Sequence, residues 1–342
     1  MKKTIAITAF LTLAFFSANA QNKVMLHSKG QVTQFSSNSP FVTAYDSSQN
    51  GDTIYLSGGT FTMPSSFNKG VQIFGAGHFP DSTKATQPTI LQGAINLAQG
   101  ADSLRVEGVY ITGDISFANN VTINQIGFNR CRFSNVNIIG TSNKSQNISF
   151  TECVVSGNFS LQNAERVLIS NSIILGRVFN GNELSITNNV FQFHYGGWHT
   201  TILFDQILNS YIANNIVFYD YDWWIYSGCT GSTFANNVFR VSSAMENTSS
   251  NFVGNVYSVN FDSLFTNLPP NNSFSYTYNY HLRNPSNYLG NDNTQVGIYG
   301  GLFPFKEGSV PVNPYIRFFN AAPKTDNDGM LEVEIEVSAQ DN

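Results

Sequence analysis

An eight-residue segment recurs seven times in the middle of the chain, and this repetition limits the fold more than any other feature. The segments begin at residues 126, 148, 167, 184, 210, 232 and 250, so successive starts are 22, 19, 17, 26, 22 and 18 residues apart. No helical pattern separates them. An irregular period near 20 residues is typical of a solenoid, in which each coil contacts only the coils before and after it.

The residues within each segment alternate between two environments, as the two-residue period of a β-strand requires. The residues on either side of the third position, such as Gly127 and Asn129, are mostly short and polar, and we expect them to face water. The third residue is always large and apolar. We expect this column to face the interior: Phe128, Phe150, Ile169, Ile186, Ile212, Phe234 and Phe252.

The sixth position forms a polar column that we interpret as structural: Cys131, Cys153, Ser172, Asn189, Asn215, Asn237 and Asn255. Asn tolerates a left-handed backbone at a tight bend, and stacked Asn side chains can hydrogen-bond to each other and to the turn backbone. The two cysteines occupy neighbouring rungs about 4.8 Å apart, which is close enough for a disulfide, although buried thiols are the favoured expectation. With Cys229, the odd count leaves at least one cysteine unpaired.

We predict an all-β protein whose residues 50–285 form a right-handed parallel β-helix, a single-stranded solenoid, after an N-terminal capping segment at 21–49. Residues 286–330 are rich in Asn, Gly and Pro and predict an extended wrapping segment. Residues 331–337 alternate apolar with acidic side chains, which predicts a half-exposed strand. This strand is expected to cap the open end of the solenoid, and a small separate β-module is the alternative.

The first 20 residues have the pattern of a cleaved export signal. Lys2 and Lys3 precede a short apolar run at 5–16, and Ala18-Asn19-Ala20 is a small-x-small cleavage site. We therefore expect a secreted, periplasmic or cell-surface protein after cleavage near Ala20, with no transmembrane segment in the mature chain. The formal net charge of −5 and the lack of a basic block argue against a nucleic-acid partner.

Several short motifs carry a resemblance to a known family. The sequence GDTIYL at 51–56, GGTF at 58–61, GAG at 75–77 and the repeated NNVF coil ends resemble the pectin-lyase-like superfamily of right-handed parallel β-helix proteins. The export signal and the GIYGG sequence at 297–301 are similar to those of exported β-helix proteins of Bacteroidetes. The resemblance implies the fold over residues 50–285 but leaves the activity open, because this superfamily hosts lyases, hydrolases, binding proteins and structural spikes.

Two aromatic-rich excursions indicate where chemistry could take place. Residues 191–199 and 218–224 follow equivalent strands of neighbouring coils, so we expect them to form one patch that binds sugar rings, unless their aromatic side chains serve only to pack the loops. His could act as a base there and Arg could stabilise developing charge. The catalytic candidates are His194, His199, Asp220, Asp222 and Arg177. The substrate-binding candidates are Tyr195, Trp198, Tyr219, Tyr221, Trp223 and Trp224.

No complete catalytic motif accompanies this patch. A polygalacturonase-like hydrolase would need paired Asp with Gly-His-Gly and Arg-x-Lys elements, and a calcium-dependent lyase would need clustered carboxylates on exposed strand positions. We predict no metal and no cofactor. Four arginines could form a mildly basic stripe, but we expect them to be ordinary surface residues that keep the solenoid soluble: Arg105, Arg130, Arg132 and Arg166. Residues 178–239 contain no Lys or Arg, which favours a neutral glycan over an acidic one.

The sequence therefore predicts an exported protein that interacts with a polysaccharide or other glycan. An active polysaccharide lyase or glycoside hydrolase is one alternative, and a structural or adhesive surface protein is the other.

Overall fold

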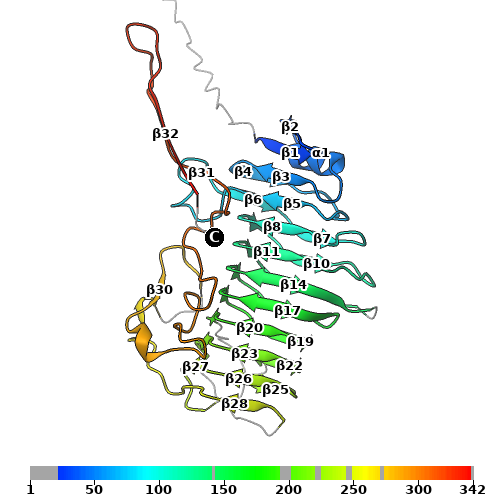
Figure 1. Ribbon diagram of the computed structural model, residues 1–342, viewed down its shortest axis with the longest axis vertical. Coiled ribbons are helices and arrows are strands. Elements are labelled where there is room, and N and C mark those ends of the chain that lie inside the picture. The colour runs from blue at the N-terminus through cyan, green and yellow to red at the C-terminus, as the bar shows by residue number, and fades with distance from the viewer. Residues whose placement is uncertain are drawn as a thin grey trace, which may run out of the picture.

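The protein is a parallel β-solenoid of about eight turns between residues 53 and 253, which confirms the predicted fold class. The computed structural model describes residues 22–140, 143–192, 202–219, 225–243, 249–269 and 273–339. The coils stack along the long axis of the molecule from the N-terminal end to β28 (Figure 1). In these ranges no helix is both long and apolar enough to cross a membrane.

The strands form three parallel files. File 1 comprises β3 (Thr53–Leu56), β5 (Gln72–Phe74), β8 (Arg105–Glu107), β11 (Gly127–Asn129), β14 (Ser145–Thr151), β17 (Ala164–Ser170), β20 (Ser185–Thr187), β23 (Tyr211–Ala213), β26 (Thr233–Ala235) and β28 (Asn251–Val253). File 2 is a separate nine-stranded sheet of β4 (Gly59–Thr62), β6 (Thr89–Gln92), β9 (Tyr110–Ile111), β12 (Arg132–Phe133), β15 (Val154–Val155), β18 (Ile173–Ile174), β21 (Val190–Phe191), β24 (Ile216–Val217) and β27 (Val238–Phe239). File 3 comprises β7 (Ile95–Leu97), β10 (Ile115–Phe117), β13 (Val136–Asn137), β16 (Phe159–Ser160), β19 (Val178–Asn182), β22 (Phe204–Leu208) and β25 (Tyr226–Ser227).

The register of file 1 places like residues directly above one another, as the repeat predicts. Phe128 pairs with Phe150, Phe150 with Ile169, and the column continues in the same register to Phe252. The Phe128 and Phe150 rings stack with centroids 5.6 Å apart. Burial of this column removes a continuous apolar surface from water, which is the main driving force for stacking the coils.

The bend between files 1 and 2 uses two consecutive residues, and only the first has a left-handed backbone. Asn188, Asn214 and Asn236 have φ values of 57°, 58° and 52°. The ladder residues that follow them, Asn189 and Asn215 among them, are buried and do not have a positive φ, so the expectation of a left-handed backbone at the ladder was wrong by one position. The first Asn supplies the turn conformation that few residues tolerate, and the second supplies the hydrogen bonds.

Each ladder side chain accepts from the backbone of the preceding rung. Asn215 Oδ1 accepts from the Asn189 backbone N–H at 2.9 Å, and the Asn215 N–H in turn donates to Asn237 Oδ1 at 3.0 Å. At the Cys rungs, the Cys131 Sγ donates to the Val106 carbonyl at 3.4 Å, and both Cys131 and Cys153 are free thiols. Burial raises the pKa of the Cys131 thiol to about 12, so it remains a protonated donor.

The N-terminal end of the solenoid is covered by β1 (Val24–Ser28), β2 (Gln31–Phe35) and α1 (Pro40–Ser47). Strand β1 pairs antiparallel with both β2 and β3, so it closes the edge of the first coil. Phe41 and Tyr45 of α1 pack against Phe67 with ring centroids 6.2 and 5.1 Å apart. The cap thereby removes both an unpaired edge and the end of the core from water.

The chain then turns back along the outside of the solenoid. After β29 (Phe265–Asn267), β30 (Asn279–Leu282) and the 3-10 helix η2 (Pro285–Asn287), residues 288–314 run along the bend between files 1 and 2 toward the N-terminal end. We call residues 288–314 the strap.

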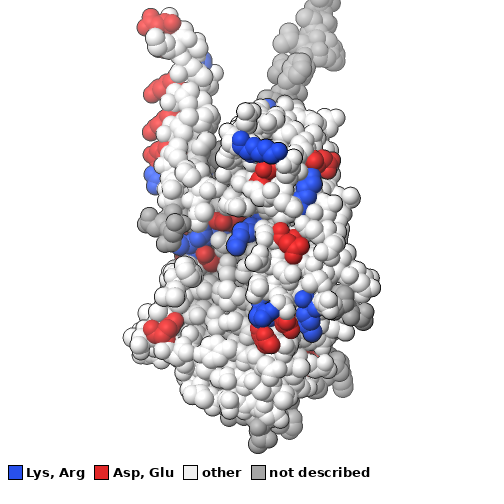
Figure 2. All heavy atoms as spheres, turned by 45° about the vertical axis from the view of Figure 1, so that its right-hand side comes forward, with Lys and Arg blue, Asp and Glu red and all other residues white. Residues whose placement is uncertain are grey.

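The predicted C-terminal strand exists, but it does not cap the solenoid. Strand β32 (Val333–Ser338) pairs antiparallel with β31 (Tyr315–Ala321), and this hairpin projects beside the N-terminal end, far from β28 (Figure 1). Its apolar face stays largely exposed, with Phe319 and Ile335 both 51% accessible. The hairpin forms a small antiparallel sheet of its own. Acidic side chains line one edge of the hairpin, whereas charges on the solenoid are sparse (Figure 2).

A second apolar core lies on the outer face of file 2. Val154, Ile173, Val190, Ile216 and Val238 point away from the solenoid interior and are all buried. Residues of the C-terminal segment, including Phe261, Phe265, Tyr280 and Val296, cover them. From β15 to β27, file 2 is thus buried on both faces. The candidate site forms at the edge of this second core.

Candidate functional site

The strap is fixed to the solenoid through the side chains at the left-handed bends. Asn171 Nδ2 donates to the carbonyls of Ile298 and Gly300 at 2.9 and 2.8 Å. Two coils earlier, Arg130 donates to the Val310 carbonyl at 3.2 Å. The strap forms one wall of the candidate site, so these contacts fix the position of that wall.

Arg130 is the centre of a buried charge cluster and not a surface residue, so that expectation was wrong. It is 3% exposed and pairs with Glu152 at 3.1 Å and with Glu107 at 3.4 Å. The two carboxylates also accept the strap backbone N–H groups of Lys306 and Val312, at 2.7 and 2.8 Å. Burial raises the pKa of Glu107, which the Arg130 charge and the Val312 hydrogen bond partly oppose.

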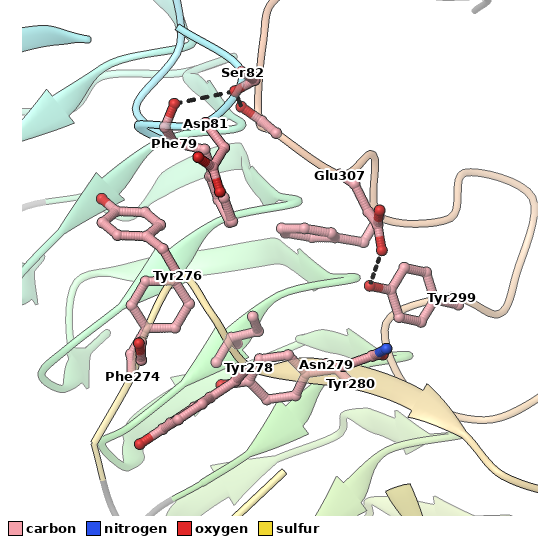
Figure 3. Close-up of a pocket in the computed structure, with 14 residues that line it drawn as sticks. Phe79, Asp81, Ser82, Phe274, Tyr276, Tyr278, Asn279, Tyr280, Tyr299 and Glu307 are labelled. Atoms are coloured by element: carbon pink, nitrogen blue, oxygen red, sulfur yellow. Dashed lines mark hydrogen bonds between the residues drawn. The ribbon is translucent and has the colours of Figure 1, made fainter. Parts of the chain in front are cut away.

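A cavity of about 420 Å³ opens beside this strap, against the outer face of file 2. Its floor is Ile173 of β18, and its walls come from the connection between β5 and β6, the segment at 274–280 and the strap (Figure 3). This volume falls within the range of small-molecule binding pockets. Seven aromatic residues line it: Phe79, Phe274, Tyr276, Tyr278, Tyr280, Tyr299 and Phe305.

The aromatic rings that form the walls pack against one another in edge-to-face contacts. The Phe79 ring meets the Tyr276 ring at a centroid distance of 4.7 Å and an interplanar angle of 70°. Phe274 and Tyr276 meet at 5.0 Å and 81°. Such contacts stabilise the walls without closing the cavity, and they keep the rings available as platforms.

Polar groups enter the cavity from two walls. Asp81 and Ser82 lie on the β5–β6 connection, and Glu307 lies on the strap opposite (Figure 3). Ser82 Oγ donates to the Gly308 carbonyl at 2.7 Å, which joins the two walls. Tyr299 Oη donates to Glu307 Oε1 at 3.2 Å, and burial, with the nearby carboxylate, raises the pKa of Tyr299.

Behind one wall, the buried His78 lies beside the partly buried Arg132 and Tyr276. Arg132 Nη1 donates to Tyr276 Oη at 2.8 Å, and His78 Nδ1 lies 3.3 Å from the same oxygen. The Arg132 guanidinium also lies 4.7 Å from the Tyr110 ring centroid. Burial, assisted by the Arg132 charge, lowers the pKa of His78 to about 3, so this imidazole is neutral at physiological pH.

The structure places only two of the predicted corner residues. Arg177 is partly exposed, with its guanidinium 4.2 Å from the Phe179 ring centroid and Nη1 3.9 Å from Asp205 Oδ2. Tyr219 is 4% exposed and belongs to the solenoid core, which leaves little of its ring accessible. The other candidates lie outside the described residues: His194, Tyr195, Trp198, His199, Asp220, Tyr221, Asp222, Trp223 and Trp224.

The strands that lead into the predicted corner are adjacent, and one of them reaches the aromatic cavity. Val190 pairs with Ile216 and Phe191 with Val217 in parallel register. Gln192, which follows β21, accepts a hydrogen bond from Tyr280 Oη at 2.8 Å and donates to the Ser273 carbonyl at 3.2 Å. The predicted corner thus begins beside a residue that lines the cavity.

Sequence reasoning missed the cavity, although one signal pointed to its floor. The file 2 strands from β15 to β27 carry two consecutive apolar residues, as in Val154-Val155 and Ile173-Ile174, which is typical of a strand buried on both faces. This pattern indicates that another segment covers file 2. It does not indicate which segment, because Phe79 and Tyr276 are separated by almost two hundred residues.

Within the described ranges, no three His, Cys, Asp or Glu side chains are grouped so that they could hold a metal ion. No protein-family model matches the chain, and neither a curated protein nor a solved structure matches it significantly.

Proposed function

We propose that this protein binds a glycan in the aromatic cavity beside the strap. The observation that carries the proposal is the lining itself, in which seven aromatic side chains surround a cavity that also presents carboxylate, hydroxyl and amide groups. Aromatic faces pack against the apolar faces of sugar rings, and a few placed polar groups fix the hydroxyls.

The charge of the lining supports a glycan without acid groups. Asp81 and Glu307 are the ionisable acids of the cavity, and no Lys, Arg or His of the described chain lines it. Two carboxylates would repel a uronate, which normally needs a cationic partner. A neutral or positively charged sugar suits the cavity better.

The protonation states behind the cavity favour binding over catalysis. Burial raises the pKa of Tyr276, so its hydroxyl keeps its proton, and His78 stays neutral and enclosed. Neither side chain is therefore suited to act as a general base that removes a proton from a ligand at neutral pH. A lyase or glycoside hydrolase that uses the corner at 191–224 remains the alternative, and a purely structural surface protein is the second.

We further infer that the chain is an exported member of the pectin-lyase-like superfamily. The parallel solenoid agrees with the resemblance of residues 50–285, and the N-terminal signal pattern supports export to the periplasm, the cell surface or the medium. Neither inference depends on the cavity.

A binding assay with matched variants tests the proposal. Isothermal titration with a panel of neutral oligosaccharides should give saturable binding that Tyr278→Ala weakens at least tenfold. Tyr55→Ala removes an exposed tyrosine outside the cavity and should leave affinity unchanged. Equal affinity of the two variants would contradict the proposal. The absence of any binding to the wild-type protein would contradict it as well.

A further inference from the structure

Two carboxylic acid side chains line the aromatic cavity, and no Lys, Arg or His of the described residues lines it. Asp81 enters from the β5–β6 connection and Glu307 from the strap, on different walls (Figure 3). The nearest basic side chains face these acids from outside the lining. Lys84 Nζ lies 3.0 Å from Asp81, and His281 Nδ1 lies 3.6 Å from Glu307.

Neither Lys84 nor His281 lines the cavity. The Lys84–Asp81 pair is highly exposed, with side chains 75% and 87% accessible, and an exposed ion pair is weak and strongly screened. The His281 ring stacks on Tyr299 at 3.9 Å and does not line the cavity. Arg132 lies behind the Tyr276 ring and donates to its hydroxyl.

The aromatic rings, like the carboxylates, attract a positively charged group. The face of an aromatic ring carries partial negative charge and attracts a cation within about 6 Å of its centroid. Arg132 shows this preference at the same wall, because its guanidinium lies 5.1 Å from the Tyr276 ring centroid and 5.3 Å from that of Phe274. On the cavity side, these walls have no cation of their own among the described residues.

We propose that the cavity selects a glycan with a free amino group, so that an ammonium at the sugar ring lies between the aromatic walls and the Asp81 and Glu307 carboxylates. This inference rests on the proposed function and adds a ligand class to it. An acetylated amine or a hydroxyl at the same ring position would have the same shape contacts but no charge to pair with the acids.

Three tetrasaccharides with the same β-1,4-linked backbone separate these cases, because they carry an ammonium, an acetamide or a hydroxyl at carbon 2. We expect the glucosamine tetramer to bind about fivefold to twentyfold tighter than the glucose tetramer at low ionic strength. High salt should reduce this preference, because exposed charges are screened. The acetylated tetramer should bind like the glucose tetramer.

Charge-removing variants locate the effect. Asp81→Asn and Glu307→Gln should each reduce glucosamine-tetramer affinity about threefold and leave glucose-tetramer affinity unchanged, since both side chains are exposed and their loss should not disturb folding. Asp262→Asn removes the same charge from an exposed site outside the cavity and should have no effect.

The outcomes distinguish this inference from the proposed function. Equal binding of all three tetramers, or an ammonium preference that survives the double variant Asp81→Asn/Glu307→Gln, overturns the amino-sugar inference and leaves glycan binding intact. If no glycan of the neutral panel and none of the three tetramers binds, both fail.

Discussion

Replacement of Asn215 by Ala should destabilise the protein strongly, although this side chain contacts no ligand. Asn215 is fully buried, and its side chain makes four hydrogen bonds. Oδ1 accepts from the backbone N–H and from Nδ2 of Asn189, while Nδ2 donates to the Ile186 carbonyl and to Asn237 Oδ1. The variant leaves the Asn189 N–H and the Ile186 carbonyl buried without these partners.

The expected loss follows from the number of bonds. A net value of about 1 kcal/mol for each buried hydrogen bond gives a decrease of about 4 kcal/mol in the free energy of unfolding. Asn255 ends the ladder with three side-chain bonds in a partly buried site, so Asn255→Ala should cost about 2 kcal/mol.

Urea unfolding followed by far-ultraviolet circular dichroism measures these changes. Asn251→Ala is the control, because Asn251 is exposed on β28, the last strand of file 1, and lies outside the ladder. If Asn215→Ala shifted the urea midpoint no more than Asn251→Ala does, the ladder would not have the stabilising role assigned to it.

Three further predictions concern other buried groups. Arg130→Met removes the cation that pairs with the buried Glu152 and the partly buried Glu107. It should lower the free energy of unfolding by about 3 to 5 kcal/mol and expose the strap to limited proteolysis; an unchanged digestion pattern refutes this. Because the pKa of His78 falls from 6.5 in the unfolded chain to about 3 in the fold, its stabilising effect is complete above pH 6.5 and lost as the pH falls toward 3. His78→Gln should flatten that slope in urea titrations, and identical slopes in both proteins contradict the assignment. Cys131 and Cys153 should resist thiol reagents at pH 8 until the protein unfolds, so rapid labelling of the native protein would show that they are accessible.

The interior of the solenoid could be predicted from sequence because the third position of every repeated segment carries a large apolar residue. Phe150 and Ile169 are neighbours in space since they hold the same place in successive segments, and a strand period of two fixes which side faces inward. The position of the left-handed residue could not be predicted so closely. Adjacent asparagines such as Asn188 and Asn189 are equally suited to a bend by residue type, and only the backbone decides which one turns.

The cavity could not be predicted, because it depends on contacts between segments that do not repeat. Phe79 precedes the repeats and Tyr276 follows them, and no periodicity relates one to the other. Arg130 was misjudged for a similar reason. Its charge suggested an ordinary surface residue that keeps the solenoid soluble, but the strap returns over the bend that carries Arg130 and buries the pair with Glu152. Arg130 is buried through a tertiary contact with the strap, and the local sequence pattern around Arg130 does not indicate that contact.

A crystal structure of the protein soaked with amino-sugar and neutral oligosaccharides would show whether the aromatic cavity binds a glycan. We expect an ordered sugar ring against the aromatic walls between Phe79, Tyr278 and Tyr299, with a carboxylate oxygen of Asp81 or Glu307 within hydrogen-bond distance. Sugar bound on the outer face of file 1, with the aromatic cavity left empty, would contradict it.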